Sequence, residues 1–193
     1  MEIIVSILLG ISLSAACGFR IFVPLLVMGV ASRSGHIVLA PGFEWIGSIP
    51  AIVAFAVATG LEIIAYYVPW LDNLLDTVAT PVAIVAGIIV MASCVSGMSP
   101  LFRWTLAVVV GGGAAGIVQG ATALTRAAST ATTGGLGNPL VSTAEAGGSF
   151  ALSLMAIVVP ALIGVVVIAV LIYAVRKIYS KMHTPPPRPC SPA

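Results

Sequence analysis

The sequence predicts an all-α membrane protein with about five transmembrane helices. Of its 193 residues, 60% are apolar and only 7% are charged, whereas about a quarter of the residues of an ordinary soluble domain are charged. The mean hydropathy is +1.17. The apolar residues fall into runs of about 20, which is the length that a helix needs to cross a bilayer. We therefore expect residues 1–183 to form a single transmembrane domain.

Five apolar runs define the expected spans, at residues 3–31, 49–69, 78–95, 104–127 and 150–175. Aromatic residues lie near the ends of several runs, among them Tyr66, Tyr67 and Trp70 at the end of the second, as in the belts at membrane interfaces. The first run is too long, and has too few N-terminal positive charges, for a cleavable signal, so we expect it to remain in the mature protein.

The first run leaves two conformations open. It is longer than about 20 residues, so a straight, tilted helix is one reading. The other is a break near Gly18, since Pro24 removes a further backbone donor and two half-helices would then meet within the membrane. Irregular backbone is tolerated there only where protein or a water-filled cavity satisfies it. The sequence does not choose between them.

Basic residues set the expected orientation, because Lys and Arg in short loops stay on the cytoplasmic side. Arg176, Lys177, Lys181 and Arg188 crowd the C-terminal end, which predicts a cytoplasmic C-terminus. Five spans then place Arg33 and Arg103 inside as well, and the loop at residues 129–148 outside. Residues 184–193 contain five prolines and are predicted to be a disordered, proline-rich tail.

An offset of about one hundred residues indicates an internal repeat. Glu44 before Gly47-Ser48 recurs as Glu145 before Gly148-Ser149. Spans 1–2 and 4–5 would then be inverted two-helix units joined by span 3, a plan that many transporters share. Small residues four apart recur in spans 1 and 4 and are expected to pack helices closely. They are Gly10, Ser14 and Gly18, and Gly112, Gly116 and Gly120.

Arg20 and Glu62 are charged residues within apolar spans, where a lone charge is costly and normally faces a protein interior. Counted from the expected cytoplasmic ends, their depths differ by only about 3 Å at helical rise. The sequence therefore predicts a buried Arg20–Glu62 pair. A structural ion pair and a gate or substrate contact are both compatible with it.

Further polar residues are expected near the outer entrance. Asp72 and Asp76 share a helical face, but two carboxylates do not complete a calcium site, so we expect no metal. The turn-rich run at residues 134–139, which includes Asn138, leads to Glu145. Arg126 lies at a depth that makes it a partner for Glu145.

Several of these segments together resemble a known family. They are the run from Ser14 through Arg20 to Pro24, then Glu62, Pro69, Asp72 and Asp76, and the run at 134–139 with Glu145. The chain, apart from its proline-rich tail, resembles an uncharacterised bacterial integral membrane family, domain of unknown function 4126. The resemblance implies a multi-span inner-membrane protein with these polar positions, and it implies no activity.

Two functions remain open. His36 and His183 are far apart, and no nucleophile set or phosphate-binding loop is present, so we expect no enzyme and no cofactor. The cysteines Cys17, Cys94 and Cys190 have no paired spacing. We favour a transporter- or channel-like protein for an ion or small solute, with Arg20 and Glu62 at its centre. The alternative is a non-transporting structural or assembly subunit. Expected partners are the lipid bilayer and a second copy or another membrane protein, but no nucleic acid.

Overall fold

The computed structural model is a bundle of helices and contains no strand in the part of the chain that it describes. It describes residues 2–66 and 69–182, with the backbone alone for residues 69–77, 178, 181 and 182. The predicted tail, residues 184–193, lies outside the described residues. The helices are α1 (Glu2–Cys17), α2 (Phe22–Arg33), η1 (Glu44–Gly47), α3 (Ile49–Ala65), α4 (Pro69–Cys94), α5 (Pro100–Leu106), η2 (Ala107–Gly112), α6 (Gly113–Thr133), α7 (Asn138–Val158) and α8 (Pro160–Met182).

The first apolar run is broken between Cys17 and Phe22, which is the second of the two conformations that the sequence left open. Gly18 lies at this break because its backbone is pressed against α6. A Cβ added there would lie 2.6 Å from the carbonyl oxygen of Ala115. Pro24 lies in the first turn of α2, where a missing backbone donor costs no intrahelical hydrogen bond.

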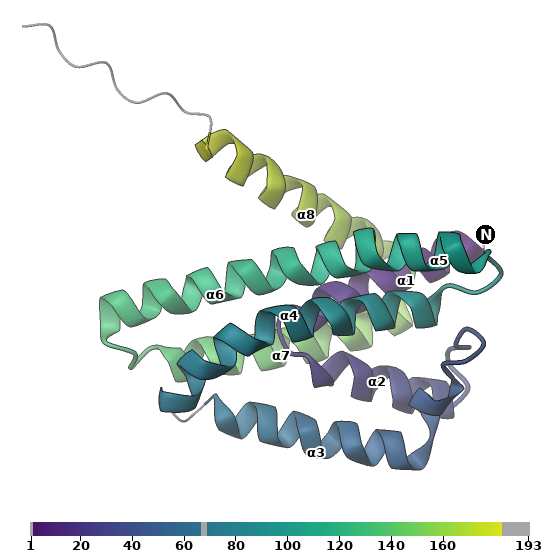
Figure 1. Cartoon of the computed structure of the whole chain (residues 1–193), viewed down its shortest axis with the longest axis horizontal. Coiled ribbons are helices and arrows are strands. Elements are labelled where there is room, and N and C mark those ends of the chain that lie inside the picture. Colours follow the sequence, from purple (N-terminus) through teal and green to yellow (C-terminus); the bar gives the residue numbers. More distant parts are fainter. Residues whose placement is uncertain (1, 67–68, 183–193) are drawn as a thin grey trace, which may run out of the picture.

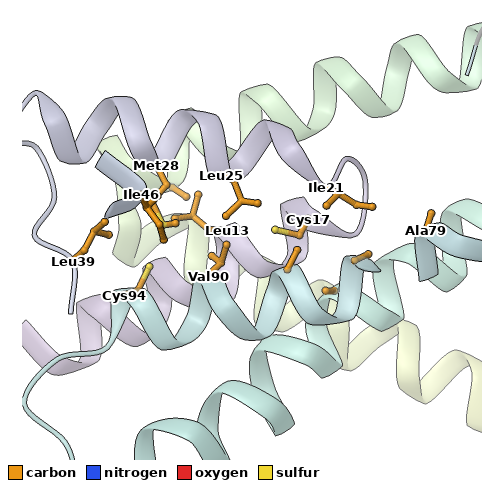
Figure 2. Close-up of a cluster of buried hydrophobic side chains, with 14 residues drawn as sticks. Leu13, Cys17, Ile21, Leu25, Met28, Leu39, Ile46, Ala79, Val90 and Cys94 are labelled. Atoms are coloured by element: carbon orange, nitrogen blue, oxygen red, sulfur yellow. The ribbon is translucent and has the colours of Figure 1, made fainter. Parts of the chain in front are cut away.

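The two halves of this run form a hairpin. In α1, Gly10 faces Met91, and one turn later the Ser14 hydroxyl donates to the carbonyl of Gly87 at 2.8 Å, so α1 runs antiparallel to α4. Helix α2 runs back the other way. Figure 2 shows Ile21 toward the Ala79 end of α4 and Met28 toward the Cys94 end.

The prediction that residues 3–31 form one span is therefore not met in this structure, because the run doubles back within the bundle. The chain enters along α1, turns at residues 18–21 and returns along α2, so both ends of the run lie at the same end of the bundle (Figure 1). Hydropathy records that each residue of the run is apolar, and it does not record the direction of the chain after a break.

Helix α4 lies at the centre of the bundle, and small residues let its neighbours pack closely on two of its sides. On one side it contacts α1, and on the other it contacts η2 and α6. A Cβ added to Gly87 would lie 2.6 Å from the Cβ of Ala115 and 2.8 Å from the carbonyl oxygen of Gly111. Segment η2 is one turn of π-helix within an otherwise continuous run from α5 to α6.

The C-terminal third differs from its prediction in two ways. The expected loop at residues 129–148 is mostly helical, because α6 continues to Thr133 and α7 begins at Asn138. The expected span at 150–175 is interrupted at Val159, where Pro160 follows and begins α8 without a backbone donor. Helix α8 returns along α1, and Gly164 lies against Leu8.

Three helical segments of the described residues are long and apolar enough to cross a membrane: residues 100–133, 138–158 and 160–177. Four shorter apolar helices, at residues 2–17, 22–33, 49–65 and 78–94, accompany them. Much of the outer surface of α3 and α8 is apolar and exposed, as expected of helices that face lipid. The part of the chain that the structure describes is therefore all-α, with helices that are long and apolar enough to cross a membrane.

The hairpin also changes the predicted distribution of charge. Helix α2, which ends at Arg33, and helix α5, which contains Arg103, reach the end of the bundle where α1 begins, whereas α8 extends toward the other end (Figure 1). Because α1 and α2 run in opposite directions, Arg33 and Arg103 do not share an end of the bundle with Arg176 and Lys177 of α8, contrary to the expectation.

Candidate functional site

A cluster of four buried charged residues lies where the tip of the α1–α2 hairpin meets α3, α6 and α7. Arg20 belongs to the tip, Glu62 to α3, Arg126 to α6 and Glu145 to α7. Their exposed fractions are 1%, 8%, 3% and 6%. Two positive and two negative charges balance, which lowers the cost of holding them in an apolar bundle.

Arg20 is held by α7. One of its terminal nitrogens, Nη2, donates to the carbonyl oxygen of Ser142 at 2.9 Å and lies 3.6 Å from Oε2 of Glu145. Its Nε and Nη1 are buried, and the described residues give them no hydrogen-bond partner. The Ser142 hydroxyl is also buried without such a partner. Arg20 is therefore only partly satisfied.

Glu145 is the shared partner of both arginines. Its carboxylate accepts from Nε of Arg126 at 3.2 Å and from Nη2 of the same side chain, which makes a bidentate pair. The depth comparison predicted this pair, and the structure contains it. Bidentate arginine–carboxylate pairs fix geometry as well as charge, so Glu145 ties α6, α7 and the hairpin tip together.

Glu62 has a different role from the predicted one. Its carboxylate accepts the backbone N–H of Ile21 at 2.9 Å and that of Phe22 at 3.2 Å. The first N–H groups of a helix have no intrahelical acceptor, and an anion is favoured at this positive end. Glu62 thus caps α2, and the predicted direct pair is corrected: the ion pair of Arg20 is with Glu145.

Tyr66 completes the cluster and was missed by the sequence reasoning, which assigned it to an interfacial belt. It is 4% exposed, and the guanidinium carbons of Arg20 and Arg126 lie 4.0 and 3.9 Å from its ring centroid. Such cation–π contacts are worth up to about 2 kcal/mol when desolvated. The feature of the sequence that could have indicated this role is the position of Tyr66 four residues after Glu62, on the same helical face.

The other predicted pathway residues are Asn138, Asp72 and Asp76. The Asn138 amide donates to the hydroxyl of Thr130 at 3.0 Å, at the start of α7. Asp72 and Asp76 lie in the first turns of α4, and their side chains are outside the described residues. The structure thus brings together Arg20, Glu62 and Glu145 of the six predicted residues.

The predicted packing residues divide similarly. Gly10 and Ser14 lie against α4, and Gly18 lies against α6. On the other side of α4, Cβ atoms added to Gly112 and Gly116 would lie 3.0 Å from Ile88 and 3.4 Å from Ile84. Nothing lies within 4 Å of a Cβ added to Gly120, so this residue is not part of the seam.

A cavity of about 460 Å³ adjoins the charged cluster. It lies between α3, α4 and the first residues of α2, and its walls are mainly aliphatic. Glu62 and Tyr66 belong both to its lining and to the cluster. A volume of this order is typical of sites for small molecules, which are mostly apolar with a few placed polar groups.

Comparisons with known proteins give one finding. No curated protein and no solved structure matches the chain. A family model does match, over residues 7–180, which include the hairpin, the charged cluster and nearly all of α8. The chain therefore belongs to the family described as Domain of unknown function (DUF4126).

Proposed function

We propose that this protein is a small transporter- or channel-like membrane protein in which the charged cluster at Arg20 and Glu62 contacts the solute. The observation that carries the proposal is the meeting of a re-entrant hairpin tip with a cavity at Glu62. Transporter sites near the middle of the membrane are commonly built from interrupted helices whose ends face the solute. Two donor nitrogens of Arg20 have no hydrogen-bond partner among the described residues. This also favours a site that binds a solute over a purely structural contact.

The topology that we propose has five crossings and one hairpin that enters and leaves at the same side. The crossings are α3, α4, the continuous run from α5 to α6, α7 and α8. The end reached by α8 carries Arg176, Lys177, Lys181 and Arg188 in its helix and tail, against Arg33 and Arg103 at the other end. The positive-inside rule then supports a cytoplasmic C-terminus, and we place the protein in a bacterial inner membrane.

The packing does not support the expected inverted repeat. The seam of Gly10 and Ser14 and the seam of Gly112 and Gly116 both pack on α4, but α1 and α6 each run antiparallel to α4 and therefore parallel to one another, whereas the matching helices of inverted halves run in opposite directions. The match between Glu44 and Glu145 does not support the repeat either. Glu44 is exposed in a short 3-10 helix, whereas Glu145 is buried within α7.

A structural or assembly subunit is the competing proposal, and one observation favours it. The Arg126–Glu145 pair is bidentate and buried, as in a contact that only locks helices together. The exposed apolar faces of α3 and α8 would then receive a second copy or another membrane protein.

Flux measurements distinguish the two proposals. Purified protein is reconstituted in proteoliposomes, and movement of ions and small metabolites is screened for the unaltered chain. Transport predicts a flux that Arg20→Ala and Glu62→Gln abolish or strongly reduce. Glu44→Gln and Arg33→Ala, which change exposed residues of the same types, are expected to leave it unchanged. Equal flux in the Arg20 and Glu62 variants and in the unaltered protein would remove the central site.

A further inference from the structure

The cavity beside Glu62 has an opening toward the surface that would face lipid. Leu61, Val78 and Val82 line it and are also 63%, 52% and 38% exposed on the outside of the bundle. Helix α3 packs on α2 and η1, which leaves an apolar gap between α3 and α4. A solute would therefore enter from among the acyl chains, and it must be apolar enough to partition there.

The charged residues that line the cavity indicate which sign of charge such a solute carries. Of the described residues that line the cavity, Glu62 is the one that carries a charge. The segment from residue 62 to residue 76 contains Glu62, Asp72 and Asp76 and no basic residue. Arg20 and Arg126 are close by, but neither lines the cavity, and both are paired with Glu145. A positive charge is thus favoured inside the cavity and a negative one is not.

Glu62 also retains the capacity to bind a ligand. An ionised carboxylate has about four acceptor positions, and the amides of Ile21 and Phe22 occupy two of them. A cation at a remaining position would neutralise part of the charge that holds the start of α2. Occupation of the cavity would thereby act on the hairpin tip.

We infer that the cavity between α3 and α4 binds an organic cation with an apolar body, whose charge pairs with Glu62 and whose body lies against Ala58, Ala79 and Val82. This inference rests on the proposed function, since it names the class of solute that the transporter carries. The bound cation enters from the bilayer, and among the described lining residues Glu62 is the charged one that it meets.

The test compares two ions that have nearly the same shape and opposite charges. Binding of tetraphenylphosphonium and of tetraphenylborate to the purified full chain is measured by equilibrium dialysis in detergent or nanodiscs. Saturable binding of the cation, at least about tenfold tighter than that of the anion, is expected, a ratio that corresponds to about 1.4 kcal/mol. Equal or tighter binding of the anion overturns the inference, and so does the absence of saturable cation binding.

Two pairs of variants locate the site. Glu62→Gln is expected to weaken cation binding at least about tenfold, whereas Glu44→Gln leaves it unchanged. Ala58→Phe fills the cavity without altering Glu62 or its hydrogen bonds and is expected to abolish binding. Ala56→Phe makes the same change at an exposed position outside the lining and should have no effect. If Glu62→Gln fails to fold, the two alanine variants still decide, and unchanged binding in Ala58→Phe overturns the inference.

Flux is recorded on the same preparations, so that the two proposals fail separately. Cation binding without movement of any solute contradicts transport and leaves the cation site standing. Flux of another solute, without cation binding, contradicts the proposed class of solute and leaves the transporter standing.

Discussion

Glu62 and Ile21, which are 41 residues apart in the chain, are joined by a hydrogen bond of 2.9 Å from the backbone N–H to the carboxylate. This bond lets α3 hold the point at which the α1–α2 hairpin turns back. The cluster around it depends on this turn, because the preceding residue is Arg20. This one contact therefore fixes both the place where the chain turns back and the position of the Glu62 carboxylate.

Loss of the Glu62 charge is expected to loosen the start of α2. Glu62→Gln keeps one side-chain oxygen as an acceptor but removes the anion, and the free energy of unfolding should fall by about 1–2 kcal/mol. Hydrogen exchange should increase at the amides of residues 21–25 other than Pro24, which has no N–H. Glu44→Gln, at an exposed carboxylate that accepts from Gly42, should change neither quantity. Unaltered exchange at residues 21–25 would show that Glu62 does not hold the helix.

The Arg126–Glu145 pair is expected to behave as a buried pair. Arg126→Met leaves Glu145 with Arg20, at 3.6 Å, as its remaining ion-pair partner among the described residues, and it should destabilise the protein by about 3–5 kcal/mol. Thermal unfolding in detergent measures the effect. The double variant Arg126→Met with Glu145→Leu should recover part of the lost stability. Arg126→Met alone leaves the two carboxylates of the cluster with one arginine, whereas the double variant leaves one carboxylate, Glu62, and one arginine, Arg20. A double variant as unstable as the sum of the two single variants would contradict this interpretation.

Two glycines of the predicted seam are expected to respond differently to alanine. At Gly18 the added Cβ would lie 2.6 Å from a backbone oxygen and 2.9 Å from a backbone nitrogen of α6, so Gly18→Ala should separate α1 from α6 and lower the melting temperature. At Gly120 the space is open, and alanine favours a helix by up to about 1 kcal/mol. Gly120→Ala should therefore be neutral or stabilising. Equal destabilisation by both variants would contradict the observed seam.

Some features could be predicted because they depend on local chemistry. The composition gives the membrane class, and Gly18 with Pro24 makes a break one of the two conformations that the sequence leaves open. The cost of a charge in an apolar span leads to Arg20 and Glu62 as buried residues. Equal depth along helices leads to the Arg126–Glu145 pair. Each of these inferences needs only the residue and its near neighbours in the sequence.

Other features depend on direction and on tertiary contact. A turn at residues 18–21 and a straight continuation have the same hydropathy, so the hairpin was not predicted. The polar start of α7 has the composition of a loop, but Asn138, Ser142 and Glu145 recur at helical spacing and become buried against α6 and the hairpin tip. Tyr66 has the sequence context of an interfacial residue, and only the approach of two arginines gives it a place in the cluster.

The sidedness of the hairpin gives the most direct test of the fold. Cys17 and Cys94 are buried, so replacement of Cys190 by serine leaves a chain without exposed thiols among its described residues. Glu2→Cys, Ser34→Cys, Ser99→Cys and Thr132→Cys then each add one thiol at an exposed position. A membrane-impermeant maleimide, applied to right-side-out and to inverted vesicles, should label the first three from one side. Thr132→Cys should react from the other side, because α5 and α6 form one continuous crossing. Labelling of Glu2→Cys and Ser34→Cys from opposite sides would mean that residues 3–31 cross the membrane once, and the charged cluster as described could not then form.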